Sequence, residues 1–144
     1  MNKIFPMESD HPLFRYFTES ERARVEGIGI VNRIPEGDFL IRAGDHDSTL
    51  FAIEDGHLDI IGADDGRQVV LATVGAGDVI GEVSFIDDSP RTVSVQAGEA
   101  TTVRAWDKRT LSEALAFEPQ LLAKFSVAMS ELLVERLRDV ARRV

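Results

Sequence analysis

Residues 77–95 read GDVIGEVSFIDDSPRTVSV. This stretch begins with a glycine turn, runs through Gly81 and Glu82 into a short apolar segment, crosses an acidic loop, and returns through Pro90 and Arg91 into a strand. If a short helical turn starts at Gly81, its unpaired backbone amides form a positive concavity that suits a phosphate. The order of these parts therefore predicts a site for a small phosphate-bearing ligand.

The two charged residues of this stretch suit different parts of such a ligand. Arg91 offers a two-pronged guanidinium to the two free oxygens of a phosphodiester, a match that lysine cannot make. Glu82 cannot contact the anion favourably, but its carboxylate can accept a hydrogen bond from a ribose hydroxyl. The alternative is a salt bridge between Glu82 and Arg91 that ties a loop to the sheet, which is a common use of this pair.

Composition limits the class of protein and its partners. A chain of 144 residues, 44% hydrophobic and 28% charged, is typical of one globular domain with a substantial core. The net charge of -9 opposes binding to nucleic acid and to anionic membrane surfaces. The chain has no cysteine, and neither a leader peptide nor an apolar run of ~20 residues is present. We therefore expect a cytoplasmic protein without direct contact to nucleic acid or membranes.

Hydrophobic patterning divides the single predicted domain, residues 1–144, into three regions. Residues 1–27 read as helical, with a capping box formed by Thr18 and Glu21. Residues 28–107 carry short apolar runs between turn glycines spaced about 7 to 12 residues apart, which predicts about eight antiparallel strands in a closed roll. The clearest hairpin turn is Asp64-Asp65-Gly66.

Residues 108–144 form the third region and read as helices. A second capping box, Thr110 and Glu113, predicts a helix through Phe117, and Pro119 enforces a break or a new start. A long helix is predicted from Gln120 to Val144. It carries a stripe at heptad spacing: Ser126, Ser130, Leu133, Leu137, Val140 and Val144. This stripe either covers the roll or forms a dimer seam, and its position at the chain terminus favours the seam.

Other candidate sites are weaker. In Gly75-Ala76-Gly77-Asp78-Val79-Ile80-Gly81 the third glycine falls one position late for a dinucleotide fingerprint, and no βαβ unit follows. Asp45-His46-Asp47, with His57 nearby in sequence, reads as a solvated turn, so we expect no metal site. Motifs of serine hydrolases, zinc proteases and P-loop enzymes are absent from the sequence, and we expect no enzyme.

Residues 77–95 resemble the phosphate-binding cassette of the cyclic nucleotide-binding domain family, with its G-E-apolar-S start and its P-R-T ending. The resemblance extends over nearly the whole chain, because further segments fall where the family has its turns: Leu13-Phe14, Pro35-Glu36-Gly37-Asp38, Ala43-Gly44-Asp45, Leu50-Phe51-Ala52-Ile53, Asp55-Gly56 and Gly75-Ala76-Gly77-Asp78. It implies a mainly β fold, an antiparallel β-roll of the jelly-roll type with N-terminal helices and a long C-terminal helix.

The resemblance also implies a ligand, cAMP first and cGMP second. Arg91 and the backbone around Ser84 and Thr92 would hold the cyclic phosphate, and Glu82 the ribose hydroxyl. The implied ligand-binding set is Ile80, Gly81, Glu82, Val83, Ser84, Pro90, Arg91, Thr92, Val93 and Arg136, with Ile80 and Val83 on the base side and Leu133, Arg136 and Leu137 as lid candidates on the last helix.

Two positions bear on the ligand. Val93 stands where the family usually has alanine and narrows the pocket if its side chain points inward. Thr92 is similar to the residue of members that accept cGMP, because a hydroxyl there can reach the guanine amino group.

We expect no output segment after Val144. We therefore expect the signal to leave by association, through a homodimer of the C-terminal helix or through an unidentified effector protein. The alternative is an interaction module that keeps the roll, has lost the nucleotide and binds partners through the same helix.

Overall fold

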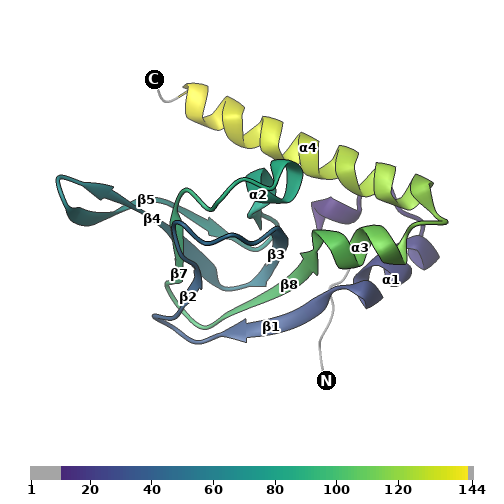
Figure 1. The fold of residues 1–144 in the computed structure, drawn as a ribbon, viewed down its shortest axis with the longest axis horizontal. Helices are drawn as coiled ribbons and strands as arrows, with labels where there is room; N and C mark the ends of the chain where they lie inside the picture. Colours follow the sequence, from purple (N-terminus) through teal and green to yellow (C-terminus); the bar gives the residue numbers. More distant parts are fainter. Residues whose placement is uncertain (1–10, 143–144) are drawn as a thin grey trace.

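The computed structural model describes residues 11–142 (Figure 1). All eight predicted strands are present. The helices are η1 (Pro12–Phe14), α1 (Glu19–Ile28), α2 (Glu82–Asp87), α3 (Lys108–Ala114) and α4 (Pro119–Arg142). The strands are β1 (Ile30–Ile34), β2 (Phe39–Ile41), β3 (Thr49–Asp55), β4 (His57–Asp64), β5 (Arg67–Gly75), β6 (Val79–Ile80), β7 (Ser94–Ala97) and β8 (Thr101–Asp107).

The strands form two four-stranded antiparallel sheets that pack face to face. One sheet has the order β1-β8-β3-β6 and the other the order β2-β7-β4-β5. The turn between β4 and β5 has positive φ angles at Asp65 (53°) and Gly66 (79°), as the predicted hairpin requires. The predicted fold class, an antiparallel β-roll with flanking helices, is confirmed.

The first sheet has a hydrophobic core on each face, because side chains alternate along its strands. In β3, Leu50 and Ala52 face the helices, while Phe51 and Ile53 face the second sheet. On the helical side the ring of Trp106 packs against Phe125 of α4, with the ring centroids 5.2 Å apart. This contact fixes the long helix against the roll, and α4 passes over α2 and α3 in Figure 1.

The predicted start of α1 agrees with the structure, whereas the predicted starts of the first strand and of α3 do not. The capping box of α1 is confirmed, since Thr18 Oγ1 accepts from Glu21 N at 3.2 Å and Glu21 Oε1 accepts from Thr18 N at 3.0 Å. Of the predicted helical region 1–27, residues 1–10 lie outside the described part of the chain. The first strand begins at Ile30, two residues later than predicted.

The predicted second capping box is wrong. The N-cap of α3 is Asp107, whose carboxylate accepts from Thr110 N at 3.0 Å, so the helix begins at Lys108. Asp107 ends β8 with an extended backbone and supplies the side-chain acceptor that an N-cap needs. The helix stops at Ala114 and not at Phe117, and Pro119 starts α4, where its missing amide hydrogen costs no hydrogen bond.

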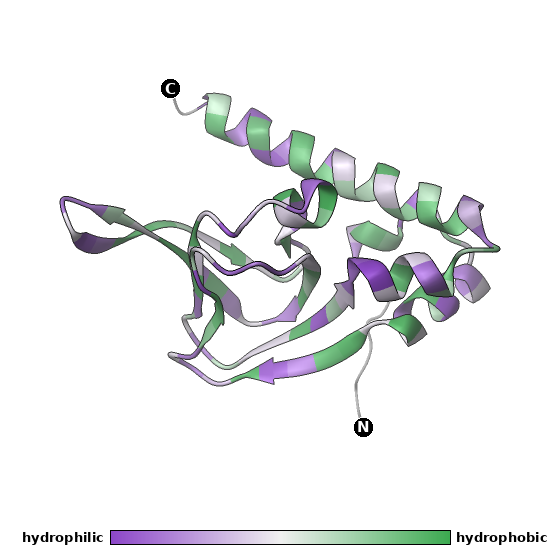
Figure 2. Ribbon diagram, in the orientation of Figure 1, coloured by the Kyte–Doolittle hydropathy of each residue, from purple (hydrophilic) through white to green (hydrophobic). Residues whose placement is uncertain are grey.

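α4 has two apolar faces. Its core face consists of Leu121, Phe125, Ala128, Met129 and Leu132. Val127, Val134 and Leu137 are exposed on another side of the helix, and Val140 is exposed farther round it. Figure 2 shows that apolar and polar residues alternate along α4. The predicted register of the outer stripe is therefore corrected: Ser126 is half-buried and donates to Leu122 O, whereas Val127 and Val134 belong to the exposed face. Val144, the last member of the predicted stripe, lies outside the described residues.

None of the helices within residues 11–142 combines the length and the hydrophobicity that crossing a bilayer requires.

Candidate functional site

Gly81 shapes the centre of the candidate site. It joins β6 to α2 with a φ of +89°, and a Cβ atom there would lie 2.6 Å from Thr49 O and 2.9 Å from Arg91 Nη1. Only glycine fits this position without moving the backbone of β3. The first hydrogen bond of α2 runs from Phe85 N to Gly81 O at 3.1 Å, so the preceding amides have no partner within the helix. The predicted helical turn after Gly81 is thus present.

Arg91 lies against this glycine and is almost completely buried, with 3% of its side chain exposed. Nη1 donates to Gly81 O at 3.2 Å, and Nη2 donates to Thr49 O at 2.8 Å and to Asp47 Oδ2 at 3.2 Å. Nε is buried and has no hydrogen-bond partner among the residues that the structure describes. A buried donor without a partner is costly, so one donor of the fixed guanidinium is left unsatisfied in this arrangement.

Glu82 is also buried and is held by the long helix. Its Oε2 accepts from Arg136 Nη1 at 2.6 Å, and Arg136 Nη2 also donates to the carbonyl of Val79. Oε1 accepts no hydrogen bond within residues 11–142. The alternative of a Glu82–Arg91 salt bridge is wrong, because Glu82 pairs with Arg136 and Arg91 pairs with Asp47.

The remaining predicted ligand-binding residues differ in how far their side chains are exposed to solvent. Ser84 is buried at the start of α2, and Ile80 is buried in the core between the two sheets. Val93 is half-buried and packs against that same core, so its side chain points into the roll.

The other members of the set are more exposed. Pro90 and Thr92 are exposed, and Val83 is 51% exposed. Of the lid candidates, Leu133 is half-buried, Leu137 is 59% exposed, and Arg136 reaches the site.

Sequence reasoning missed Asp47 and Thr49. The sequence around Asp47 predicts a solvated turn, but Asp47 Oδ2 contacts Arg91 and Asp47 Oδ1 accepts from Thr49 Oγ1 at 2.7 Å. The backbone brings these segments together, since Arg91 N donates to Asp45 O at 2.8 Å. No spacing rule connects residues this far apart in sequence, and local patterning therefore carries no signal for this contact.

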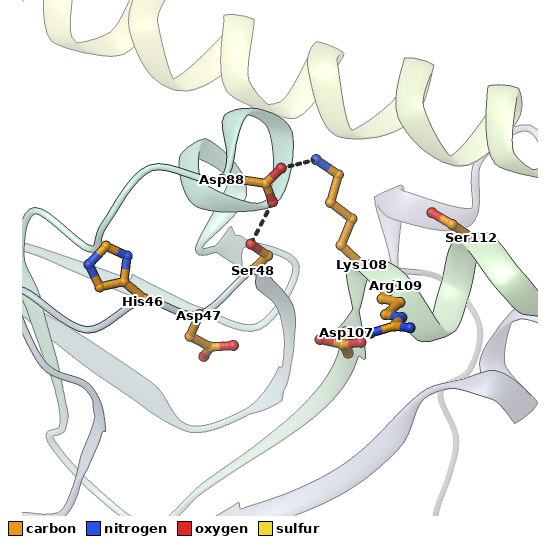
Figure 3. Close-up of a pocket in the computed structure, with 8 residues that line it drawn as sticks. All are labelled: His46, Asp47, Ser48, Asp88, Asp107, Lys108, Arg109 and Ser112. Carbon is orange, nitrogen blue, oxygen red and sulfur yellow. Dashed lines mark hydrogen bonds and ion pairs between the residues drawn. The ribbon is translucent and has the colours of Figure 1, made fainter.

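A cavity of about 560 Å³ adjoins the site and shares Asp47 with it (Figure 3). Asp88, which ends α2 in the left-handed conformation, accepts from Ser48 Oγ at 2.8 Å and from Lys108 Nζ at 3.1 Å. These two hydrogen bonds hold the pKa of the Asp88 carboxyl below its usual range. The hydrogen bond with Lys108 also ties the end of α2 to the start of α3.

No group of three or more His, Asp or Glu side chains within residues 11–142 is arranged to hold a metal ion. The family model described as cyclic nucleotide-binding domain matches residues 31–116, more than half of the chain. This chain belongs to the cyclic nucleotide-binding domain family. Domains of this family are regulatory modules, and the resemblance inferred from residues 77–95 is confirmed.

Relatives of this cyclic nucleotide-binding domain include kinase components. It is 28% identical over 104 residues to the cAMP-dependent protein kinase regulatory subunit of Mycosarcoma maydis, covering 72% of this chain and 20% of the relative. It is 30% identical over 136 residues to the cGMP-dependent protein kinase of Plasmodium berghei, covering 87% of this chain and 15% of that kinase. The chain thus spans a fifth or less of the length of these curated relatives.

A solved structure has the same fold. The cyclic nucleotide-binding domain from Methylobacillus flagellatus KT superposes with a TM-score of 0.83 at 29% identity, covering 89% of this chain and 72% of that chain.

Proposed function

We propose that this cyclic nucleotide-binding domain is a regulatory sensor that binds cAMP, with cGMP as the second candidate. The observation that carries the proposal is the buried guanidinium of Arg91, which is fixed by three acceptors and keeps its Nε donor without a partner. A phosphodiester anion satisfies that donor and removes the cost of its burial.

The neighbouring groups suit the remaining parts of the ligand. The amides of Val83 and Ser84 precede the first hydrogen bond within α2, which suits a cyclic phosphate held by Arg91. Glu82 offers Oε1 to a ribose hydroxyl while Oε2 stays bonded to Arg136. Ile80 and Val83 supply apolar surface for the base, and Pro90, Thr92 and Val93 border the phosphate.

Fewer observations distinguish cAMP from cGMP. Thr92 is exposed beside Arg91, where its hydroxyl suits the guanine amino group and favours cGMP. One relative is a cAMP-dependent protein kinase regulatory subunit and another is a cGMP-dependent protein kinase, so sequence similarity supports either ligand. We place cAMP narrowly first.

Signalling is assigned to α4, because Arg136 connects this helix directly to Glu82 and to Val79. Nucleotide binding at Glu82 shifts the balance between packings of α4, and the helix passes the change to a second copy or to an effector protein. Hydrogen exchange of residues 120–142 with and without nucleotide tests this route. We expect a change in amide protection there on binding, and equal protection in both states would contradict the assignment.

A second candidate function is an interaction module that binds no nucleotide. The observation in its favour is that both site charges already have protein partners, Arg91 in Asp47 and Glu82 in Arg136. The exposed apolar face of α4 would then be the binding surface.

Calorimetric titration of the purified protein with cAMP and cGMP separates the two functions, with adenosine as a control that lacks the phosphate. The sensor proposal predicts saturable binding of one cyclic nucleotide per chain and no binding of adenosine. A protein that is folded but releases no heat with either cyclic nucleotide would support the interaction module.

A further inference from the structure

We propose that Lys108 is a positioning residue for the nucleotide site, because it holds the end of α2 and the segment that fixes Arg91 in one arrangement. The inference rests on the proposed function in taking Arg91 and the start of α2 as the nucleotide site. It adds to that site a residue of α3, which lies outside residues 77–95.

Asp88 has a backbone conformation that few residue types adopt. It ends α2 with a φ of +60° and a ψ of 20°, in the left-handed region that favours glycine. Its amide donates to Ser84 O at 2.8 Å, so this conformation closes the last turn of the helix. Glycine would adopt it at the least cost, and the aspartate is therefore explained by what its side chain binds.

The side chain of Asp88 joins α2 to two other segments, as Figure 3 shows. Oδ1 accepts from Ser48 Oγ at 2.8 Å, and Oδ2 accepts from Lys108 Nζ at 3.1 Å. Lys108 Nζ also donates to Ile86 O at 3.2 Å, and the backbone amide of Lys108 donates to Ser48 O at 3.1 Å. We call Ser48, Asp88 and Lys108 the Lys108 cluster. Each of its members is hydrogen-bonded to the other two.

The Lys108 cluster contacts both segments that form the nucleotide site. Ser48 stands between Asp47 and Thr49, whose oxygens accept from Arg91 Nη2 at 3.2 Å and 2.8 Å. Asp88 follows the helix that begins at Glu82 and has only six residues. A movement at the end of so short a helix also moves its start. The cluster therefore sets where Glu82 lies relative to the guanidinium of Arg91.

The ion pair of the cluster adds little to the stability of the fold. Side-chain exposure is 34% for Lys108 and 64% for Asp88, and solvent screens ion pairs that are this exposed. The packing of α3 comes instead from Leu111, which is buried in the core beneath the helices. A protein that lacks the Lys108 amine should thus fold, with α2 held less firmly.

Hydrogen exchange of the protein without nucleotide tests the inference independently of the proposed function. Lys108→Met keeps most of the aliphatic side chain and removes Nζ, so Ile86 O and one oxygen of Asp88 lose their donor. We expect the amides of Phe85 and Asp88, which are bonded within α2, to exchange about threefold to tenfold faster.

Lys124→Met is the matched control for this measurement. Lys124 is 35% exposed and pairs with Glu21 at 2.7 Å, on the α1 side of α4 and away from the nucleotide site. We expect the amides of α2 to exchange in this variant as they do in the wild type. Equal exchange of these amides in both lysine variants would overturn the proposal.

Calorimetric titration with cAMP and cGMP tests the effect on the site. We expect Lys108→Met to bind about threefold to tenfold more weakly than the wild type, with a similar melting temperature, and Lys124→Met to bind like the wild type. Asp88→Gly keeps the left-handed backbone and loses both side-chain hydrogen bonds, so it should weaken binding as well. Unchanged affinity in Lys108→Met would overturn the proposal.

The double variant tests whether the two residues act through one contact. Lys108→Met combined with Asp88→Gly should lose no more affinity than the weaker-binding single variant, because either change already breaks the pair. Losses that simply add would overturn the proposal. A wild-type protein that binds neither nucleotide would reject the sensor function, whereas faster exchange in Lys108→Met would still support Lys108 as the residue that orders α2.

Discussion

Arg136 connects the candidate site to the long helix α4. It comes from α4 and holds one oxygen of Glu82 at 2.6 Å, while the other oxygen of that carboxylate keeps no partner within residues 11–142. Side-chain exposure is 28% for Arg136 and 7% for Glu82, so this ion pair is partly shielded from solvent. We infer that Arg136 holds the Glu82 carboxylate in the direction that suits a ribose hydroxyl. Arg136 and the hydroxyl would then bind different oxygens of that carboxylate and would not compete.

The substitution Arg136→Ala tests this role. Without the guanidinium the buried carboxylate of Glu82 loses its partner and its fixed direction, so we expect nucleotide affinity to fall about tenfold, or about 1.4 kcal/mol. Arg138→Ala, two residues along the same helix and exposed, is the matched control and should bind like the wild type. Calorimetric titration of both variants measures the effect. Tighter binding by Arg136→Ala would mean that Arg136 competes with the ligand for Glu82.

At the scale of elements, η1 is tied through His11 to the turn that leads into the candidate site. His11 caps this short helix, with its Nδ1 accepting from Leu13 N at 3.1 Å, so its Nε2 carries the proton and donates to Asp78 O at 3.2 Å. Asp78 immediately precedes β6, which leads into Gly81. The neutral imidazole therefore holds η1 against the turn that leads into β6 and Gly81.

This arrangement predicts a pH dependence of stability. Burial lowers the pKa of His11 from its usual value of 6.5. The backbone hydrogen bond to Asp78 and the charge of its carboxylate raise this pKa, but burial outweighs them, and the positive charge of Arg15 lowers it further. The unfolded chain then binds a proton more readily than the folded one, so the contribution of His11 is present above pH 6.5 and is lost as the pH falls through the lowered pKa. Urea unfolding at a series of pH values from about 7.5 to about 5 measures how the free energy of unfolding changes over this range.

His11→Asn is the matched control, because asparagine can still cap the helix but does not titrate in this range. His46 and His57 remain in both proteins, so any difference in slope belongs to His11. An identical loss of stability on acidification in both proteins would contradict the account.

Elements were predictable where their signals are local. Thr18 and Glu21 mark the start of α1 because both partners of that cap lie within one turn. The start of α3 was misplaced because Thr110 and Glu113 have capping-box spacing, whereas Asp107 reads from sequence as the end of a strand. Both the Thr110–Glu113 spacing and Asp107 are possible helix starts. The extended backbone that makes Asp107 the N-cap results from the pairing of β8 with β1 and β3, which local sequence does not show.

For the whole molecule, the order of strands and turns could be read from alternation and glycine spacing, and residues 77–95 could be identified as the centre of the site. The contacts that define the site could not. Asp47 with Arg91 and Arg136 with Glu82 are 44 and 54 residues apart and meet only through the closed roll. For the same reason the two apolar faces of α4 could not be distinguished, since the roll decides which face is buried.

The most direct test of the sensor function is calorimetric titration of cAMP and cGMP into Arg91→Leu beside the wild type. Losing a buried arginine opposite a phosphate should cost ~2 to 5 kcal/mol, or roughly thirty-fold to several thousand-fold in affinity. Arg33→Leu makes the same change at an exposed position on β1 and should bind like the wild type.

Arg91→Lys keeps the charge without the fork and serves as a second variant if Arg91→Leu does not fold, with circular dichroism confirming the fold of each protein. We expect strong nucleotide binding in the wild type and in Arg33→Leu, and weakened binding in both Arg91 variants. Wild-type affinity in a folded Arg91→Leu protein would contradict it.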